Sequence, residues 1–229
     1  MSQRAPWAAT TLAVLTLLTG CGDPELLDPT EEPLAADRER LVAHMTGGLT
    51  AIADHLGAGD ELGTRIDTGC TAGTDNWKIH DTHRSTCGLT ITTGFPLEAG
   101  PDAAFGGLDG LDSFEEALDE QGWGSIDWFV QGNDWGTGVD VDWMRANRRP
   151  VTDVIGVRLW SADGDGTFIE ASFRPSDAPV GPASPGTVDG GYYADTAGED
   201  WQDAWSTARD RHPFLIVGYG HAVLAEQPW

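Results

Sequence analysis

The spacing of apolar residues changes along this chain, and that change limits the folds open to it. Between residues 41 and 56, apolar residues recur every three or four positions: Leu41, Met45, Leu49, Ile52 and Leu56. This period places them on one face of a helix, and Gly57 is expected to end it. Gly47 and Gly48 each weaken such a helix by up to about 1 kcal/mol, which a close contact between helix and sheet would explain.

Later segments alternate between apolar and polar residues, the pattern of strands with one buried face. The alternation occurs in residues 70–94, 126–130, 139–143 and a hairpin over 157–173, and the apolar segment 214–224 predicts a buried final strand. Two further helices are expected, at 114–121 from the capping box Ser113 to Glu116, and at 199–209. Residues 95–112 and 175–191 are expected to be loops. This order predicts an α+β fold, an antiparallel sheet with helices packed on one face.

The N-terminal segment contains a short apolar run that ends at a cysteine. Arg4 precedes the apolar residues 7–18, and the run ends in Leu18-Thr19-Gly20-Cys21. These residues closely resemble a bacterial lipoprotein signal, which is cut before a cysteine that carries acyl chains such as palmitate. The run of about 12 residues is shorter than the roughly 20 that a membrane-spanning helix needs. Ordinary secretion with an unmodified Cys21 is the other alternative.

This resemblance implies a lipid-anchored protein on the extracytoplasmic face of the cell membrane. Residues 1–20 would be the signal peptide, the acidic residues 21–33 a tether, and residues 34–229 a single α+β domain. With Cys21 acylated, Cys70 and Cys87 remain, and an oxidising compartment would pair them in one disulfide. In layout, with a helix before a cysteine-bearing strand, the chain also resembles small secreted lipoproteins of actinobacteria, among them the mycobacterial LppA type.

The charge of the chain restricts its partners. Its formal net charge is −24, whereas nucleic-acid binding needs clustered basic residues, so no nucleic-acid partner is expected. Docking on anionic lipid through the protein surface is disfavoured for the same reason. The expected partners are the membrane, through the N-terminal lipid, and an envelope protein or a cell-wall glycan.

Two groups of residues are candidates for ligand binding. Trp135 follows Asp134 between turn residues, and an exposed indole beside a carboxylate suits a sugar; the alternative is a tryptophan that fills the core. Arg145, Arg148 and Arg149 form a basic cluster that could hold a carboxylate or phosphate. The alternative for this cluster is that it neutralises nearby acids.

The sequence offers little support for metal binding or catalysis. His80 and His83 would point to opposite faces of a strand, and the calcium-like segment 163–166 lacks acids at Ser161 and Ser172, so no metal site is expected. No nucleophile elbow, zinc-binding helix or phosphate loop is present, and no cofactor is expected. We therefore expect a non-enzymatic envelope protein that binds a ligand or partner. Acid pairs such as Asp140 and Asp142 leave a cell-wall glycan hydrolase as the alternative.

Overall fold

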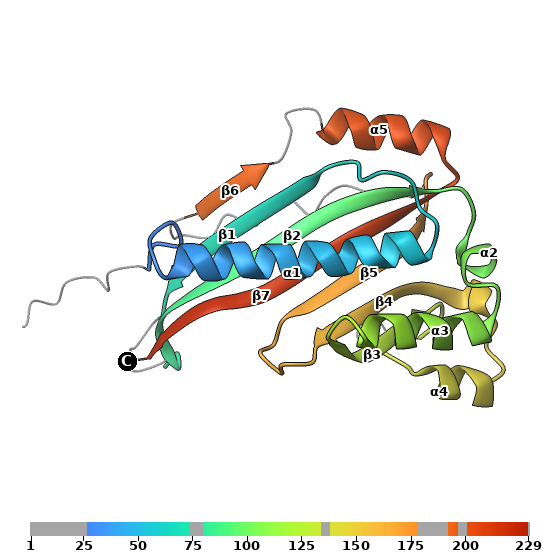
Figure 1. Cartoon of the computed structure of the whole chain (residues 1–229), viewed down its shortest axis with the longest axis horizontal. Coiled ribbons are helices and arrows are strands. Elements are labelled where there is room, and N and C mark those ends of the chain that lie inside the picture. Colours follow the sequence, from blue (N-terminus) through green and yellow to red (C-terminus); the bar gives the residue numbers. More distant parts are fainter. Residues whose placement is uncertain (1–26, 74–79, 134–137, 178–191, 197–200, 229) are drawn as a thin grey trace, which may run out of the picture.

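The chain folds as a seven-stranded antiparallel sheet with helices on it, which confirms the predicted α+β class (Figure 1). The computed structural model describes residues 27–73, 80–133, 138–177, 192–196 and 201–228. The strands, in sheet order, are β3 (Trp123–Val130), β4 (Val154–Ser161), β5 (Phe168–Pro175), β7 (Phe214–Pro228), β2 (His83–Leu97), β1 (Thr64–Ala72) and β6 (Tyr192–Thr196). The helices are α1 (Leu34–His55), α2 (Pro101–Phe105), α3 (Leu108–Asp119), α4 (Val141–Ala146) and α5 (Trp201–Arg211).

Helix α1 lies along one face of the sheet and supplies the predicted apolar stripe (Figure 1). The five residues that predicted the helix are all buried in the main core cluster. Two glycines of β7 let the helix approach: a Cβ on Gly218 would lie 2.9 Å from Leu49, and one on Gly220 would lie 2.9 Å from Met45. The sequence prediction of an amphipathic helix on a sheet is confirmed, and α1 begins earlier, at Leu34.

Helix α5 packs on the opposite face, at one end of the sheet. Trp205 lies over Gly94 of β2, where a Cβ would be 2.3 Å from the indole ring, and it shares a small core cluster with Ala208 and Leu215. Leu215 alternates with Ile216, which belongs to the main core, so the two clusters lie on different faces. The prediction that the helices pack on one face therefore does not hold for α5, which packs on the other.

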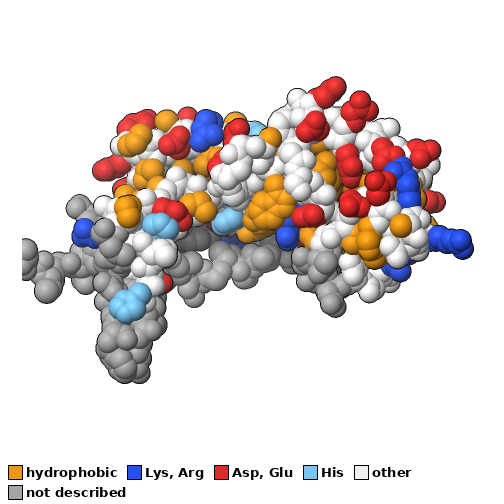
Figure 2. Space-filling view, turned by 90° about the horizontal axis from the view of Figure 1, so that it is seen from below, with side chains coloured by type: hydrophobic (Ala, Val, Ile, Leu, Met, Phe, Trp, Pro, Cys, Tyr) orange, Lys and Arg blue, Asp and Glu red, His pale blue; other side chains and the backbone are white. Residues whose placement is uncertain are grey.

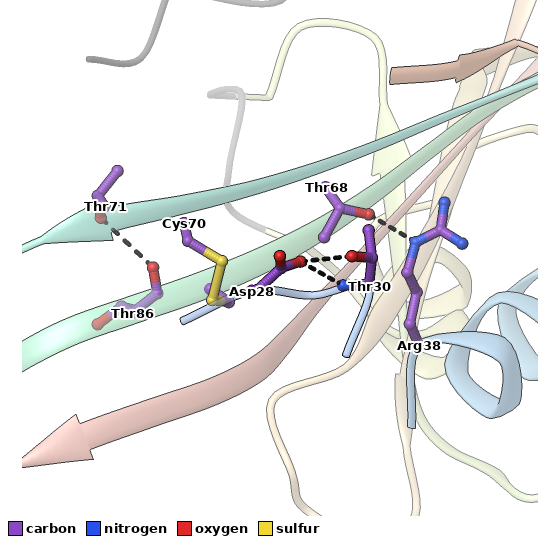
Figure 3. Close-up of a disulfide and its surroundings, with 8 residues drawn as sticks. Asp28, Thr30, Arg38, Thr68, Cys70, Thr71 and Thr86 are labelled. Carbon is purple, nitrogen blue, oxygen red and sulfur yellow. Dashed lines mark hydrogen bonds between the residues drawn. A yellow bond between two sulfur atoms is a disulfide. The ribbon is translucent and has the colours of Figure 1, made fainter. Parts of the chain in front are cut away.

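The Cys70–Cys87 disulfide joins β1 to β2 at directly paired positions (Figure 3). Both cysteines are buried in the core, as expected for a structural bridge. Close to it, Arg38 of α1 donates from Nε to Thr68 Oγ1 at 2.9 Å, which ties the start of α1 to β1. Within the predicted tether, Leu27 packs against the core and Pro29 is buried, whereas residues 30–33 are exposed. Trp77 and Ile79, also used to predict the first strands, lie outside the described residues.

Three local predictions are wrong. Residues 95–112, expected to form a loop, contain the end of β2, all of α2 and the start of α3, which opens at Leu108 rather than near Phe114. The expected capping box does not form, because Ser113 lies inside α3 and its Oγ donates to the Asp109 carbonyl at 3.2 Å. The strand predicted at 139–143 is instead a single bridge between Val139 and Trp128 followed by helix α4.

Candidate functional site

The face of the sheet opposite α1 carries a group of aromatic and charged side chains. Leu159 and Ile169 point into the core, and because side chains alternate along a strand, their neighbours point to the other face. We call six of these partly exposed residues the aromatic platform: Arg158 and Trp160 of β4, Phe168 and Glu170 of β5, and Tyr219 and His221 of β7.

The register of the three strands brings these side chains into two adjacent rows. Trp160 pairs with Phe168, which pairs with His221; in the next row, Arg158 pairs with Glu170, which pairs with Tyr219. Residues directly opposite each other in antiparallel strands have Cβ atoms about 5 Å apart, so their side chains touch. The platform is therefore built from two residues in each of the strands β4, β5 and β7.

The rings of the platform lie in contact with one another. The ring centroid of Phe168 lies 5.1 Å from that of Trp160, 5.5 Å from that of His221 and 6.1 Å from that of Tyr219. The rings are tilted by 41 to 52° rather than stacked flat. Such tilted aromatic contacts are favourable by about 0.5–1.5 kcal/mol each, so the rings hold one another in place.

Arg158 forms the polar centre of the platform. Its guanidinium donates to Glu170 Oε2 from Nη2 at 2.8 Å and from Nε at 3.2 Å. The same group lies 5.0 Å from the ring of Phe129 and 5.1 Å from that of Phe168, within the range of cation–π attraction. Arg158 is thus fixed by both an ion pair and aromatic faces, and both bonds to Glu170 use one of its two carboxylate oxygens.

Burial shifts the pKa values of two platform residues. Partial desolvation lowers the pKa of His221, which favours the neutral imidazole at neutral pH. Desolvation, helped by the negative charge of Glu170, raises the pKa of Tyr219, so its hydroxyl stays protonated. Both groups therefore offer neutral hydrogen-bonding functions beside the Arg158–Glu170 pair.

An aspartate and a tryptophan do meet on this face, although they are not neighbours in the sequence. The indole Nε1 of Trp160 donates to Asp127 Oδ2 of β3 at 3.1 Å. Of the tryptophans next to acids in the sequence, Trp128 is buried and donates to Glu115 Oε1 at 2.6 Å, and Trp143 is 38% exposed on α4. Trp135, the predicted glycan contact, and the side chain of Trp201 lie outside the described residues.

The predicted basic cluster is divided among local acids. Arg145 pairs with Asp112, with Asp142 at 3.3 Å and with Asp109 at 3.6 Å, and its pKa is raised mainly by the hydrogen bond to Asp112. Arg149 pairs with Asp153 at 3.0 Å. Arg148 is exposed in a left-handed conformation, with φ 53°, after the end of α4. For Arg145 and Arg149 the structure agrees with charge neutralisation.

A second candidate is a surface hollow of about 370 Å³ beside α3. It is lined by Asp112, Glu115, Glu116, Asp119, Gly124, Ile126 and Asp140. Figure 2 shows acidic side chains gathered on the part of the surface that carries α3 and α4. Burial raises the pKa of Glu115, against the hydrogen bond from Trp128, and the negative charges of Asp112 and Asp140 add to the rise.

The acid pair named from the sequence is split by this arrangement. Asp140 lines the hollow and caps α4, since its Oδ1 accepts a hydrogen bond from the Trp143 amide at 2.6 Å. Asp142 is instead exposed and pairs with Arg145. Glu115, which the sequence prediction did not single out, is partly buried, whereas the other carboxylates that line the hollow are exposed.

The platform was not predicted because its rows depend on long-range pairing. The hairpin of β4 and β5 was expected, and its register alone places Arg158 opposite Glu170. The strand on the other side of β5 is β7, which begins 39 positions after β5 ends, and no local pattern shows that the two pair.

Within the described ranges, no three His, Cys, Asp or Glu side chains are arranged to hold a metal ion. The helices in that same part of the chain include none long and apolar enough to cross a membrane. No family model, curated protein or solved structure matches the chain.

Proposed function

We propose that this protein is a cell-envelope lipoprotein, anchored through Cys21 on the extracytoplasmic face of the membrane, that binds a ligand or partner through the aromatic platform. The observation that carries the binding role is the platform itself. Partly exposed aromatic side chains beside a few fixed polar groups are typical of ligand sites, because the rings supply contact area and the polar groups set orientation. The ring contacts and the Arg158–Glu170 pair hold this arrangement ready in the folded protein.

The anchoring role rests on Leu18-Thr19-Gly20-Cys21 and is supported by the cysteine arrangement. Cys70 and Cys87 pair with each other, which is compatible with acylation at Cys21, the third cysteine of the sequence. A disulfide buried in the core is also typical of proteins that fold outside the reducing cytoplasm.

Anchoring at Cys21 gives the domain an orientation. Six Cα steps separate Cys21 from Leu27, so the chain can span at most about 20 Å between them. Leu27 packs against the core, and the next residue, Asp28, lies in the surroundings of the disulfide (Figure 3). The C-terminal end of β7 lies at the same end of the sheet, where Ala225 pairs with Cys87. That end would therefore face the bilayer, and the helices α2 and α4 would lie toward the far end, away from anionic headgroups.

Metabolic labelling with an alkyne fatty acid tests the anchor. The wild-type protein and the Cys70→Ala, Cys87→Ala double variant are expected to be labelled, and Cys21→Ser is expected to be unlabelled. Labelling of Cys21→Ser, or no labelling of the wild type, would overturn the anchoring role.

Binding is tested by co-sedimentation with a lipid-free, insoluble cell-wall fraction from the cells that produce the protein. The detergent-purified wild type is expected to sediment with it, and Trp160→Ala to remain largely in solution. Trp143→Ala is the matched control, because Trp143 is an exposed tryptophan that lies on α4 and not on a strand of the platform. No sedimentation of the wild type, or equal loss in both variants, would contradict a binding role for the platform.

Hydrolysis of a cell-wall glycan is a second candidate function, and the hollow beside α3 is the observation that favours it. A carboxyl with a raised pKa, such as that of Glu115, suits a general acid, and Asp140 lines the same hollow as a second carboxylate. The test is release of soluble sugar from purified cell wall. Loss of this release in Glu115→Gln would support hydrolysis, and no release by the wild type would reject it.

A further inference from the structure

The chemistry of the aromatic platform points to one class of ligand. We infer that the platform binds an uncharged glycan, with sugar rings lying on Trp160 and Phe168 and their hydroxyls bonded to Glu170, Asp127 and Arg158. This inference rests on the proposed ligand-binding function and narrows it to a substrate class.

This face combines the groups that bind a sugar. A pyranose ring has an apolar face of C–H bonds, which packs on an aromatic ring, and a rim of hydroxyls that both donate and accept hydrogen bonds. The rings of Trp160 and Phe168 lie side by side at 5.1 Å. Glu170 and Asp127 supply hydrogen-bond acceptors, and Arg158 and Tyr219 supply hydrogen-bond donors. Flat rings bordered by donors and acceptors suit a sugar better than a purely apolar ligand.

The Arg158–Glu170 pair keeps hydrogen-bonding capacity for a ligand. Both bonds from Arg158 reach the same oxygen of Glu170, Oε2, and they come from Nε and Nη2. A carboxylate has about four lone-pair positions and a guanidinium has five N–H groups, so neither is filled by the other. The side chains are 25% and 18% exposed, which keeps them within reach of a ligand on the surface.

The charges of the platform and of the chain disfavour an anionic ligand. Arg158 is compensated by Glu170 at 2.8 Å, and the low pKa of His221 keeps that ring neutral at neutral pH. The platform therefore offers no uncompensated cation to hold a phosphate or carboxylate. The net charge of −24 on the chain further repels anionic polymers. An uncharged glycan needs no free cation and is not repelled by this net charge.

A peptide is the alternative occupant of the platform. An extended peptide binds a sheet most readily by adding a strand to its edge, where backbone groups are free to pair. The platform lies instead on β4, β5 and β7, and each of these strands has a neighbour on both sides. Its side chains, not its backbone, meet the ligand. Across the two strand spacings it measures roughly 10 Å, which is wide enough for more than one sugar ring.

Isothermal titration with sugars tests this inference on the detergent-purified, full-length protein. The probes are uncharged hexasaccharides of glucose, mannose and galactose, with oligogalacturonate of the same length as the anionic comparison. At least one uncharged hexasaccharide is expected to bind the wild type, and the anionic one to bind about tenfold more weakly or not at all.

Variants place the binding on the platform. Trp160→Ala is expected to lower affinity about tenfold or more, Trp160→Phe to retain most of it, and Trp143→Ala to leave it unchanged. Glu170→Gln, which keeps the shape and one acceptor, is expected to lower it several-fold. Circular dichroism at each titration temperature shows whether Trp160→Ala is folded. If it is not, the affinities of Trp160→Phe and Glu170→Gln, compared with that of the wild type, test whether the platform binds the sugar.

Three results would overturn the inference: no uncharged hexasaccharide binds, oligogalacturonate binds as tightly, or Trp143→Ala loses as much affinity as Trp160→Ala. If no sugar binds while the cell-wall co-sedimentation still depends on Trp160, the ligand is another component of the wall. The binding function then stands and the glycan class is rejected. If neither depends on Trp160, both are rejected.

Discussion

Gly48 of α1 lies against the indole of Trp123, so closely that a Cβ on Gly48 would be 2.6 Å from the ring. The ring has little room to move, because Trp123 is 1% exposed and His44 stacks on it at 4.5 Å. The sequence suggested a close contact between helix and sheet at Gly47 and Gly48, and the structure assigns it to Gly48 alone. Nothing lies within 4 Å of a Cβ placed on Gly47.

Substituting these two glycines separates helix propensity from packing. Gly47→Ala is expected to raise the free energy of unfolding by about 0.5–1 kcal/mol, since alanine favours the helix and meets no neighbour. Gly48→Ala gains the same propensity but overpacks the core, which costs about 1–3 kcal/mol, so a net loss is expected. Urea unfolding of both variants measures the difference. A Gly48→Ala protein as stable as Gly47→Ala would show that the contact is not tight.

Removing the disulfide tests how much it stabilises the sheet. Cys70 and Cys87 are 17 positions apart, and closing a loop of that size stabilises the folded state by about 3 kcal/mol in the chain-entropy model. The Cys70→Ala, Cys87→Ala double variant is expected to lose about that amount in urea unfolding. A reducing agent should destabilise the wild type and leave the double variant unchanged. Equal stability of the two proteins without reductant would contradict a structural role.

The raised pKa of Glu115 predicts how the stability of the protein depends on pH. Burial raises its pKa, so the folded protein holds the proton more tightly than the unfolded chain, and the contribution of Glu115 to stability falls as pH rises above the unfolded value. Glu115→Gln keeps an acceptor for Trp128 Nε1 and does not titrate. The stability of this variant relative to wild type is therefore expected to be higher at about pH 7 than at about pH 4.

Urea unfolding at both pH values measures the change, with Glu116→Gln, an exposed neighbour on α3, as the control. A relative stability of Glu115→Gln that is the same at both pH values, or higher at the lower one, would show that burial does not raise the pKa of Glu115.

Much of the fold could be predicted from residue spacing. The apolar stripe of α1 was a strong signal because it continues over several turns, and the shorter alternation in Ile126, Trp128 and Val130 also fell on a strand, β3. Residues 139–143 misled, since Val139, Val141 and Trp143 alternate as in a strand. Over so few residues a helix can show the same pattern. Asp140 was the better signal, because its carboxylate caps α4.

In residues 95–112, amino-acid composition predicted the secondary structure less well than the positions of individual residues. The abundance of glycine and proline predicted a loop, yet Pro101 occupies the first turn of α2, where its missing N–H is no loss. The candidate site was harder still. Tyr219 and Glu170 come together only when β7 pairs with β5, and that pairing is decided by the packing of the whole sheet rather than by either segment.

The proposed orientation on the membrane predicts unequal distances from the bilayer. Glu226 is exposed near the disulfide end of the sheet, and Asp102 is exposed on α2 beyond the other end of β2, a strand of 15 residues or roughly 50 Å. A fluorophore on Glu226→Cys is expected to be quenched strongly by acceptor lipids in vesicles that carry the acylated protein. One on Asp102→Cys should be quenched much less. Equal quenching would contradict this orientation.

The most direct test of the central claim is mass spectrometry of the N-terminal peptide of the protein purified from its own membrane. Anchoring through Cys21 predicts that residues 1–20 are absent, that Cys21 is the first residue, and that its mass includes acyl chains. A peptide that still contains residues 1–20, or one in which Cys21 has an unmodified thiol, would contradict the claim.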